Sequence, residues 1–226
     1  MKKALLSLGG LLVLVAVGVI VTKPPLLRIK KIECYTQFGA CTEELVDRAQ
    51  FLLGRPIYVP LPRKEIARTY ADFPTISQVE VYRRLPSTIV LSIAVRRPIA
   101  VVLGISAERV VVDETGVVFA PIDRSALPTL KVDSDVYQGS TLTDNQLTAS
   151  RQLSQVGSIV AVPVTGRLNG NILTITTSTG ITIILDTIQP DNGWAASLQA
   201  IWSRSKIDGK IMRKIDLRFS RPTVSY

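Results

Sequence analysis

The longest apolar stretch lies near the N-terminus, where residues 4–22, ALLSLGGLLVLVAVGVIVT, contain no charged side chain. At about 1.5 Å per residue, a helix of this length spans roughly 28 Å, close to the ~30 Å hydrocarbon core of a bilayer. A cleavable signal peptide has a shorter apolar region and a small-residue cleavage site, which this run lacks. A buried core helix is disfavoured because no polar face interrupts the run. The pattern predicts a cytoplasmic tip and a retained transmembrane anchor over residues 1–25.

Flanking lysines alone favour the orientation with the N-terminus outside the cytoplasm, because more basic residues follow the apolar run than precede it. A domain of about 200 residues follows, however, and long domains translocate largely regardless of flanking charge. We therefore expect a single-pass protein with a cytoplasmic N-terminus and its bulk outside the cytoplasm.

In residues 26–98, stretches in which apolar residues recur at every second position are interspersed with stretches in which they recur at helical spacing. This pattern predicts a strand at 27–34, helices at 42–54 and 62–73, and strands at 76–84 and 88–96. Thr42 is a suitable N-cap, and Phe73-Pro74 ends the second helix. The result is a β-α-α-β-β module.

Its final hairpin reads VEVYRRLPSTIVLSIAVRR from residue 79. The apolar surface of this sheet is expected from Val79, Val81 and Tyr82 in the first strand and from Ile89, Leu91, Ile93 and Val95 in the second. Because side chains alternate along a strand, the odd-numbered residues from 89 to 95 lie on one face. This face is expected to pack under Leu45, Ala49, Ile66 and Tyr70. The hairpin is interpreted mainly as a scaffold, and its exposed edge is available for docking a partner.

Residues 99–226 are dominated by short strands. Strands are predicted at 99–103, 109–113, 117–120, 127–132, 162–169, 172–178, 181–186 and 211–219, with helices near 143–157 and 194–207. The fold class is therefore α+β: the anchor, the small module, and a mostly antiparallel β domain with two helices.

The distribution of charge along the sequence indicates a basic surface near the predicted anchor. The net charge is +9, and from Arg28 to Pro98 there are 12 basic and 7 acidic residues, against 12 and 11 from Ile99 onward. The excess lies near the predicted anchor, where anionic headgroups attract a basic residue by about 1 kcal/mol. A solvated basic face without a partner is an equal alternative. Nucleic acid is disfavoured because the domain is tethered to a membrane outside the cytoplasm.

Catalytic chemistry has little support. The chain contains no histidine, which removes the commonest general base and zinc ligand, and two cysteines cannot make a structural zinc site. No glycine-rich phosphate loop or nucleophile elbow is present. We expect a protein that is not an enzyme and that uses no cofactor or metal.

Cys34 and Cys41 are the only cysteines and flank the segment YTQFGA. Outside the cytoplasm, two cysteines are more often bridged than free. We therefore hypothesise a disulfide that ties the end of the first strand to the start of the first helix, worth about 2–3 kcal/mol. Two small buried thiols are the alternative.

Several of these segments together resemble the FtsQ/DivIB family of cell-division proteins. The first module, with TEEL at 42–45, IYVPLPRKEIARTY at 57–70 and the LP-turn hairpin, is similar to a POTRA module. VVVDETGVVFA at 110–120, LPTL at 127–130 and KIDLRFSRPTV at 214–224 are similar to later motifs of the family. Three differences mark a distant member: Arg96 where the family often has glutamate, the cysteine-containing insertion, and a missing tryptophan near 102–103.

The resemblance implies a POTRA-like domain at 26–98 and an FtsQ-type β domain at 99–226. It implies a scaffold of the bacterial divisome, located in the cell membrane at the septum. Its partners would be FtsB-like and FtsL-like bitopic proteins and, through them, the septal peptidoglycan synthase. A POTRA-bearing assembly or transport factor that binds unfolded chains is the alternative.

The last strand is the predicted partner-binding site. A terminal strand is expected at a sheet edge, and Pro222 suits an edge because it donates no ladder hydrogen bond. Ile215 and Leu217 are expected to face the core, and Asp216 and Arg218 to face outward. Phe219 stays open between core and interface, although the resemblance favours interface. The expected contacts for strand addition are Asp216, Arg218, Phe219, Arg221, Pro222, Thr223 and Val224.

Overall fold

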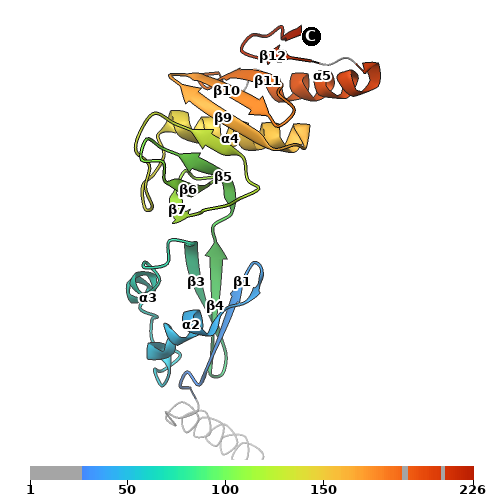
Figure 1. The fold of residues 1–226 in the computed structure, drawn as a ribbon. Coiled ribbons are helices and arrows are strands. Elements are labelled where there is room, and N and C mark those ends of the chain that lie inside the picture. The colour runs from blue at the N-terminus through green and yellow to red at the C-terminus, as the bar shows by residue number, and fades with distance from the viewer. Residues whose placement is uncertain (1–26, 190–192, 210–211) are drawn as a thin grey trace, which may run out of the picture. The chain divides into compact units, whose positions relative to one another are not determined.

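A computed structural model describes residues 27–189, 193–209 and 212–226 of the chain. These residues divide into two compact units, unit 1 up to Val95 and unit 2 from Arg96 onward, whereas the sequence predicted the boundary at 98/99. Helices and strands occur in both units, so the predicted α+β class is confirmed (Figure 1). The predicted anchor at 1–25 lies outside the described residues. Within those residues, no helix is long and apolar enough to cross a membrane.

Unit 1 is a four-stranded sheet with two short α-helices and one 3-10 helix. Its elements are β1 (Lys31–Thr36), β2 (Gly39–Ala40), α2 (Glu43–Asp47), the 3-10 helix η1 (Gln50–Leu52), α3 (Arg63–Thr69), β3 (Ile76–Arg84) and β4 (Thr88–Val95). The strand order is β2-β1-β4-β3, so β3 is an outer strand. Strands β1 and β4 run parallel, and the other pairs are antiparallel.

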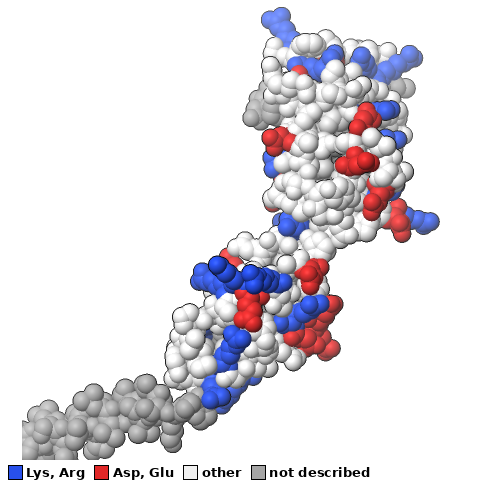
Figure 2. Space-filling model, turned by 90° about the vertical axis from the view of Figure 1, so that its left-hand side faces the viewer, with Lys and Arg blue, Asp and Glu red and all other residues white. Residues whose placement is uncertain are grey.

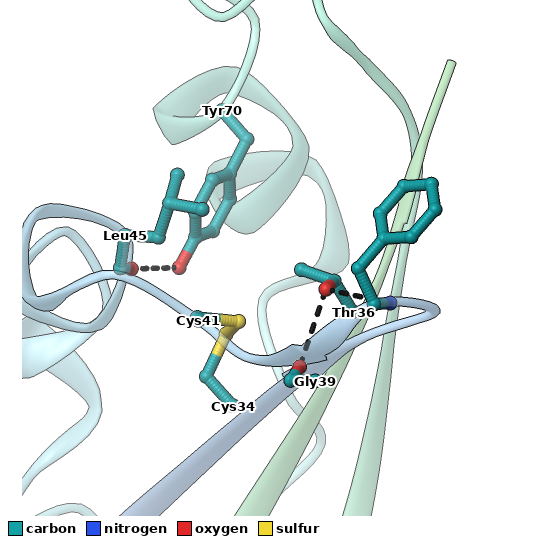
Figure 3. The surroundings of a disulfide bond; sticks show 7 residues. Cys34, Thr36, Gly39, Cys41, Leu45 and Tyr70 are labelled. Atoms are coloured by element: carbon teal, nitrogen blue, oxygen red, sulfur yellow. Dashed lines mark hydrogen bonds between the residues drawn. A yellow bond between two sulfur atoms is a disulfide. The ribbon is translucent and has the colours of Figure 1, made fainter. Parts of the chain in front are cut away.

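The core of unit 1 follows the alternation of β4. Ile89, Leu91 and Ile93 are at most 1% exposed. They share a buried cluster with Ala49, Ile66 and Tyr70, as the sequence predicted. The Tyr70 hydroxyl reaches across this cluster and donates a hydrogen bond of 2.7 Å to the Leu45 carbonyl (Figure 3). The prediction for Tyr82 was wrong, because its ring is 53% exposed.

The predicted helix at 42–54 is not continuous. Helix α2 ends at Asp47, and the chain continues as the 3-10 helix η1. The tighter turn is held by bonds from the Leu52 and Leu53 amides to carbonyls three residues earlier. In this conformation both Ala49 and Leu52 are buried. Tertiary burial therefore overrides the helical propensity of a segment too short to be stable alone.

Cys34 and Cys41 form a disulfide that closes a tight hairpin between β1 and β2, with Cα atoms 5.3 Å apart (Figure 3). Thr36 lies opposite Gly39, and the Cys41 amide donates to the Cys34 carbonyl at 3.1 Å. Gly39 has a φ of +133°, which favours glycine. The sequence predicted a connecting loop here, and the two-residue strand β2 was missed.

Unit 2 is built on a nine-stranded mixed sheet. Its strands are β5 (Pro98–Leu103), β6 (Arg109–Asp113), β7 (Val118–Pro121), β8 (Thr129–Lys131), β9 (Val164–Asn169), β10 (Ile172–Thr177), β11 (Thr182–Asp186), β12 (Lys214–Asp216) and β13 (Thr223–Ser225). The helices are α4 (Asp144–Val160) and α5 (Trp194–Asp208). The strand order is β13-β12-β11-β10-β9-β8-β5-β6-β7. Five pairings are antiparallel, and β5–β8, β8–β9 and β11–β12 are parallel.

Helices α4 and α5 supply side chains to a continuous core against the sheet. Thr143 caps α4 in a capping box with Gln146, which matches the predicted start of this helix. Leu153 of α4 packs closely on Gly166 of β9: a Cβ atom at 166 would lie 3.1 Å from its Cδ1. Strands β9 to β11 alternate buried residues with exposed or partly buried ones, so one face of this part of the sheet is covered.

Candidate protein-binding site

Strands β12 and β13 form the C-terminal hairpin, residues 214–225, at one end of the unit 2 sheet (Figure 1). The prediction of one regular edge strand at 211–219 was wrong. Strand β12 ends at Asp216 and is internal, because β11 flanks it on one side and β13 on the other. Residues 217–222 turn the chain, and only β13 lies at the edge. Pro222, which has no amide hydrogen, directly precedes β13.

Asp216 is 7% exposed, so the prediction that it faces outward was wrong. Its carboxylate accepts two hydrogen bonds from the Arg218 guanidinium, of 3.0 and 2.7 Å, and one from the Arg218 amide. The hydrogen bonds from Arg218 hold the pKa of Asp216 below its ordinary value, although burial acts in the opposite direction. The pair fixes the start of the turn.

Phe219 follows this pair and is exposed. Ile215 and Leu217 are at most 1% exposed, as predicted, but the Phe219 ring is 60% exposed. The Arg218 guanidinium carbon lies 5.3 Å from the centre of that ring, within cation–π range. Buried Asp216 therefore orients Arg218, and Arg218 in turn packs on an aromatic ring open to solvent.

The remaining predicted site residues surround this ring and the outer strand. Arg221 and Thr223 are exposed, and Pro222 and Val224 are half-buried. Val224 packs against the core of unit 2. Figure 2 shows Lys and Arg side chains at the end of unit 2 that carries the hairpin; the exposed basic residues there include Arg213, Lys214 and Arg221. Tyr226 adds a second exposed aromatic side chain, 61% accessible.

The edge of β13 can pair with another strand. As the last strand in the sheet order, β13 has a neighbour only on the β12 side within the described residues. An outer strand presents backbone N–H and C=O groups that can form a ladder with an added chain. With an exposed aromatic and several cations beside it, the edge is suited to an extended segment that carries apolar and acidic side chains.

A second buried carboxylate stabilises the turn between β6 and β7. Asp113 accepts bonds from the Thr115 amide and hydroxyl, the Val117 amide and, at 2.6 Å, the Arg96 guanidinium. Burial raises the pKa of Asp113, but the hydrogen bonds from Thr115, Arg96 and the two amides outweigh it, and the net pKa is lowered. Asp113 therefore holds this turn in its charged, carboxylate form.

Unit 2 is therefore expected to lose stability in acid. A carboxyl whose folded pKa is lowered contributes stability that is present above its unfolded pKa of about 3.9 and is lost as the pH falls through the folded value. The melting temperature of unit 2 should begin to fall near pH 5 and should continue to fall as the pH drops through the lowered folded pKa values of Asp113 and Asp216. Calorimetry of the Asp113→Asn/Asp216→Asn variant should show a lower melting temperature at neutral pH and a flatter acid dependence.

Asp133→Asn is the matched control for that experiment. Asp133 pairs with Arg167 at 3.5 Å, and both side chains are more than 60% exposed, so this pair should contribute little. An acid dependence that stays unchanged in the double variant would show that Asp113 and Asp216 do not cause it.

A groove of about 1040 Å³ runs along β3, the outer strand of unit 1. Its walls are the connector from Tyr58 to Leu61, the start of α3, and residues 78–83 of β3. Arg83 donates a 2.7 Å hydrogen bond to the Val59 carbonyl and so ties the connector to the strand. The sequence predicted that this hairpin edge would be exposed, but it gave no signal for the groove.

Within the described ranges, no cluster of three or more cysteine, aspartate or glutamate side chains could hold a metal ion. Neither a scan against protein-family models nor a search of curated proteins finds a match to this chain.

Proposed function

We propose that this protein is a single-pass membrane scaffold of the bacterial divisome, of the FtsQ/DivIB type. In this proposal unit 1 is a POTRA-like domain, unit 2 is an FtsQ-type β domain, and both lie outside the cytoplasm. The protein links the partners of septal cell-wall synthesis by protein–protein contacts and catalyses no reaction. The proposal is supported by the motif resemblance and by the element order of unit 1, which is β-α-α-β-β apart from the added two-residue strand β2 and the 3-10 helix η1.

The observation that carries the proposal is the C-terminal hairpin. The motif KIDLRFSRPTV has the exposed Phe219 ring at the position that the resemblance assigns to binding an FtsB-like partner. The adjacent strand β13 is an open edge. The sequence led us to expect a partner strand that contacts residues 216–224. In the proposed docking, the partner strand instead pairs with the backbone of 223–225, and Phe219 and Arg221 contact its side chains.

The anchor gives this docking its physical advantage. Residues 4–22 would confine the protein to the plane of the membrane, as the anchors of FtsB-like and FtsL-like proteins would confine the partners. Confinement raises the effective concentration of each binding surface, so modest strand pairing suffices for a stable complex. The septal peptidoglycan synthase would join through these partners.

The test is site-specific cross-linking with the full-length chain in its native membrane. A photo-reactive amino acid at Thr223, which is exposed on β13, should give one main product. Mass spectrometry should identify it as a small single-pass protein of the FtsB-like kind. Tyr137 is the matched control, because it is 63% exposed on the same unit but lies outside the hairpin. No product at 223, or the same product at 137, would contradict the proposal.

The β3 groove favours a second candidate function, a POTRA-bearing assembly or transport factor that binds unfolded chains. An open outer strand beside a long groove can accept extended segments of many sequences, because the backbone provides most of the pairing. A photo-reactive residue at the exposed Gln78 would then capture a mixture of envelope proteins rather than one partner.

A further inference from the structure

Three segments of unit 1 meet at the end where the described chain begins. We call this surface the Leu85 end; it comprises residues 28–31, 53–56 and 84–87. The Ile29 amide donates to the Arg55 carbonyl at 2.9 Å, and the Gly54 amide donates to the Ile29 carbonyl at 2.9 Å. The Lys30 amide donates to the Ser87 carbonyl at 2.8 Å. These backbone bonds bring side chains from distant parts of the sequence onto one surface.

The Leu85 end combines cations with exposed apolar side chains. Its basic residues are Arg28, Lys30, Lys31, Arg55 and Arg84, all exposed. Glu33 pairs with Lys31 at 2.9 Å and with Arg84 at 2.6 Å, and Glu65 pairs with Arg55 at 3.6 Å. Arg28 and Lys30 form no ion pair within the described part of the chain. The surface is therefore net positive, and Figure 2 shows Lys and Arg side chains at this end of unit 1.

Two leucines project from this cationic surface. Leu85 is 73% exposed at the tip of the β3–β4 hairpin, and Leu53 is 43% exposed beside Gly54. An exposed leucine flanked by lysines and arginines is the combination with which peripheral proteins bind a bilayer interface. The apolar side chain enters the headgroup boundary, while the cations remain beside the phosphates.

The length of chain before this surface limits its distance from the proposed anchor. Four residues lie between Thr22, the last residue of the uncharged run, and Leu27, so the two are five Cα–Cα steps apart. An extended chain covers at most about 3.6 Å per residue, so Leu27 lies within roughly 18 Å of the end of that run. Leu27 itself belongs to this end of unit 1, because its carbonyl accepts from the Ile57 amide at 2.8 Å.

We propose that the Leu85 end docks on the anionic phospholipid headgroups of the membrane that holds the anchor. Arg28, Lys30 and Arg84 lie against lipid phosphates, and Leu85 enters the interfacial layer. This contact fixes the height and the facing of unit 1 above the bilayer. It rests on the membrane anchoring in the proposed function, and it adds a lipid-binding surface to a protein-binding scaffold.

The test uses the full-length chain reconstituted into vesicles of phosphatidylcholine, with or without phosphatidylglycerol. An environment-sensitive fluorophore is attached to Leu85→Cys, and the native cysteines are bridged and do not react. With phosphatidylglycerol, the emission should shift to shorter wavelength and be quenched by spin labels carried at the lipid interface. Without it, or in high salt, both signals should decrease strongly, because screening weakens the attraction.

Two further variants make the outcome decisive. The same fluorophore at Ile105→Cys, a residue 68% exposed in unit 2, should show neither the shift nor the quenching. Arg28→Glu/Lys30→Glu should abolish the response at residue 85 with an unchanged melting temperature, because neither side chain forms an ion pair in the described structure.

The inference and the proposed anchor can fail separately. If the chain floats with the vesicles but the probe at 85 behaves like the probe at 105, the docking is overturned and the anchor stands. If the chain does not float with vesicles of either composition, both are overturned. A response at 85 that is independent of phosphatidylglycerol overturns recognition of anionic lipid.

Discussion

Phe219→Ala is expected to weaken binding of the hairpin's partner about 30-fold or more, while the melting temperature of unit 2 changes by no more than a few degrees. The ring is 60% exposed, so its removal leaves no cavity in the core. Truncating an aromatic residue at the centre of an interface typically costs 2 kcal/mol or more of binding energy, or about 30-fold in affinity. Titration of the full-length variant with the purified partner in detergent would measure the affinity, and calorimetry the stability.

Tyr137→Ala is the matched control, because Tyr137 is 63% exposed on unit 2 but outside the hairpin. This variant should bind as the unaltered protein does. Arg221→Glu should also weaken binding, since it reverses a charge beside the proposed partner strand. Replacing a core phenylalanine by alanine costs about 3–5 kcal/mol of folding stability. A Phe219→Ala variant with a melting temperature lowered to match would contradict an exposed ring. Unchanged affinity in both hairpin variants contradicts docking at this edge.

The second large effect concerns the disulfide. Cys34→Ala/Cys41→Ala should lower the stability of unit 1 by about 2.5 kcal/mol, because closing a loop of this length restricts the unfolded chain by about that amount. In a unit of this size the melting temperature should fall by roughly 10–20 °C. Calorimetry should show the shift in the unit 1 transition and none in the unit 2 transition.

Reduction of the unaltered protein separates the bridge from the packing of its cysteines. Cys34 is 6% exposed, so the alanine variant also loses some buried volume. A reductant breaks the bridge but retains the volume, and it should reproduce most of the shift. It should leave the alanine variant unaffected. An unaltered protein whose melting temperature is insensitive to reductant would show that the bridge contributes no stability.

Local patterns predicted much of the fold. Strand β3 matches its predicted range, and β4, β9, β10, β11, α4 and α5 agree to within a few residues. These elements have clear alternation or a helical stripe together with a cap or turn residue. Strand β2 was missed, and the 3-10 helix η1 was predicted as part of a longer helix. Two or three residues are too few to show a hydrophobic periodicity, and their conformation depends on what they pack against.

The geometry of the C-terminal hairpin was predicted less well, for an identifiable reason. Counting along one regular strand placed Asp216 on the outward face and left Phe219 open between core and interface. The chain instead turns after Asp216, where the Leu217 amide donates to Ile184 of the neighbouring strand. That bond depends on the parallel pairing of β11 with β12, a long-range contact that no local pattern contains. The carboxylate therefore points inward to Arg218, and the ring points to solvent.

The central claim, that this protein is a membrane-held scaffold of the divisome, is tested most directly by its location in dividing cells. The measurement is fluorescence microscopy of a fusion to the full-length chain, in cells that have no other copy of it. The account predicts a band at mid-cell that appears before constriction and persists during septum formation. A signal spread uniformly around the envelope in cells that are visibly dividing would contradict the account.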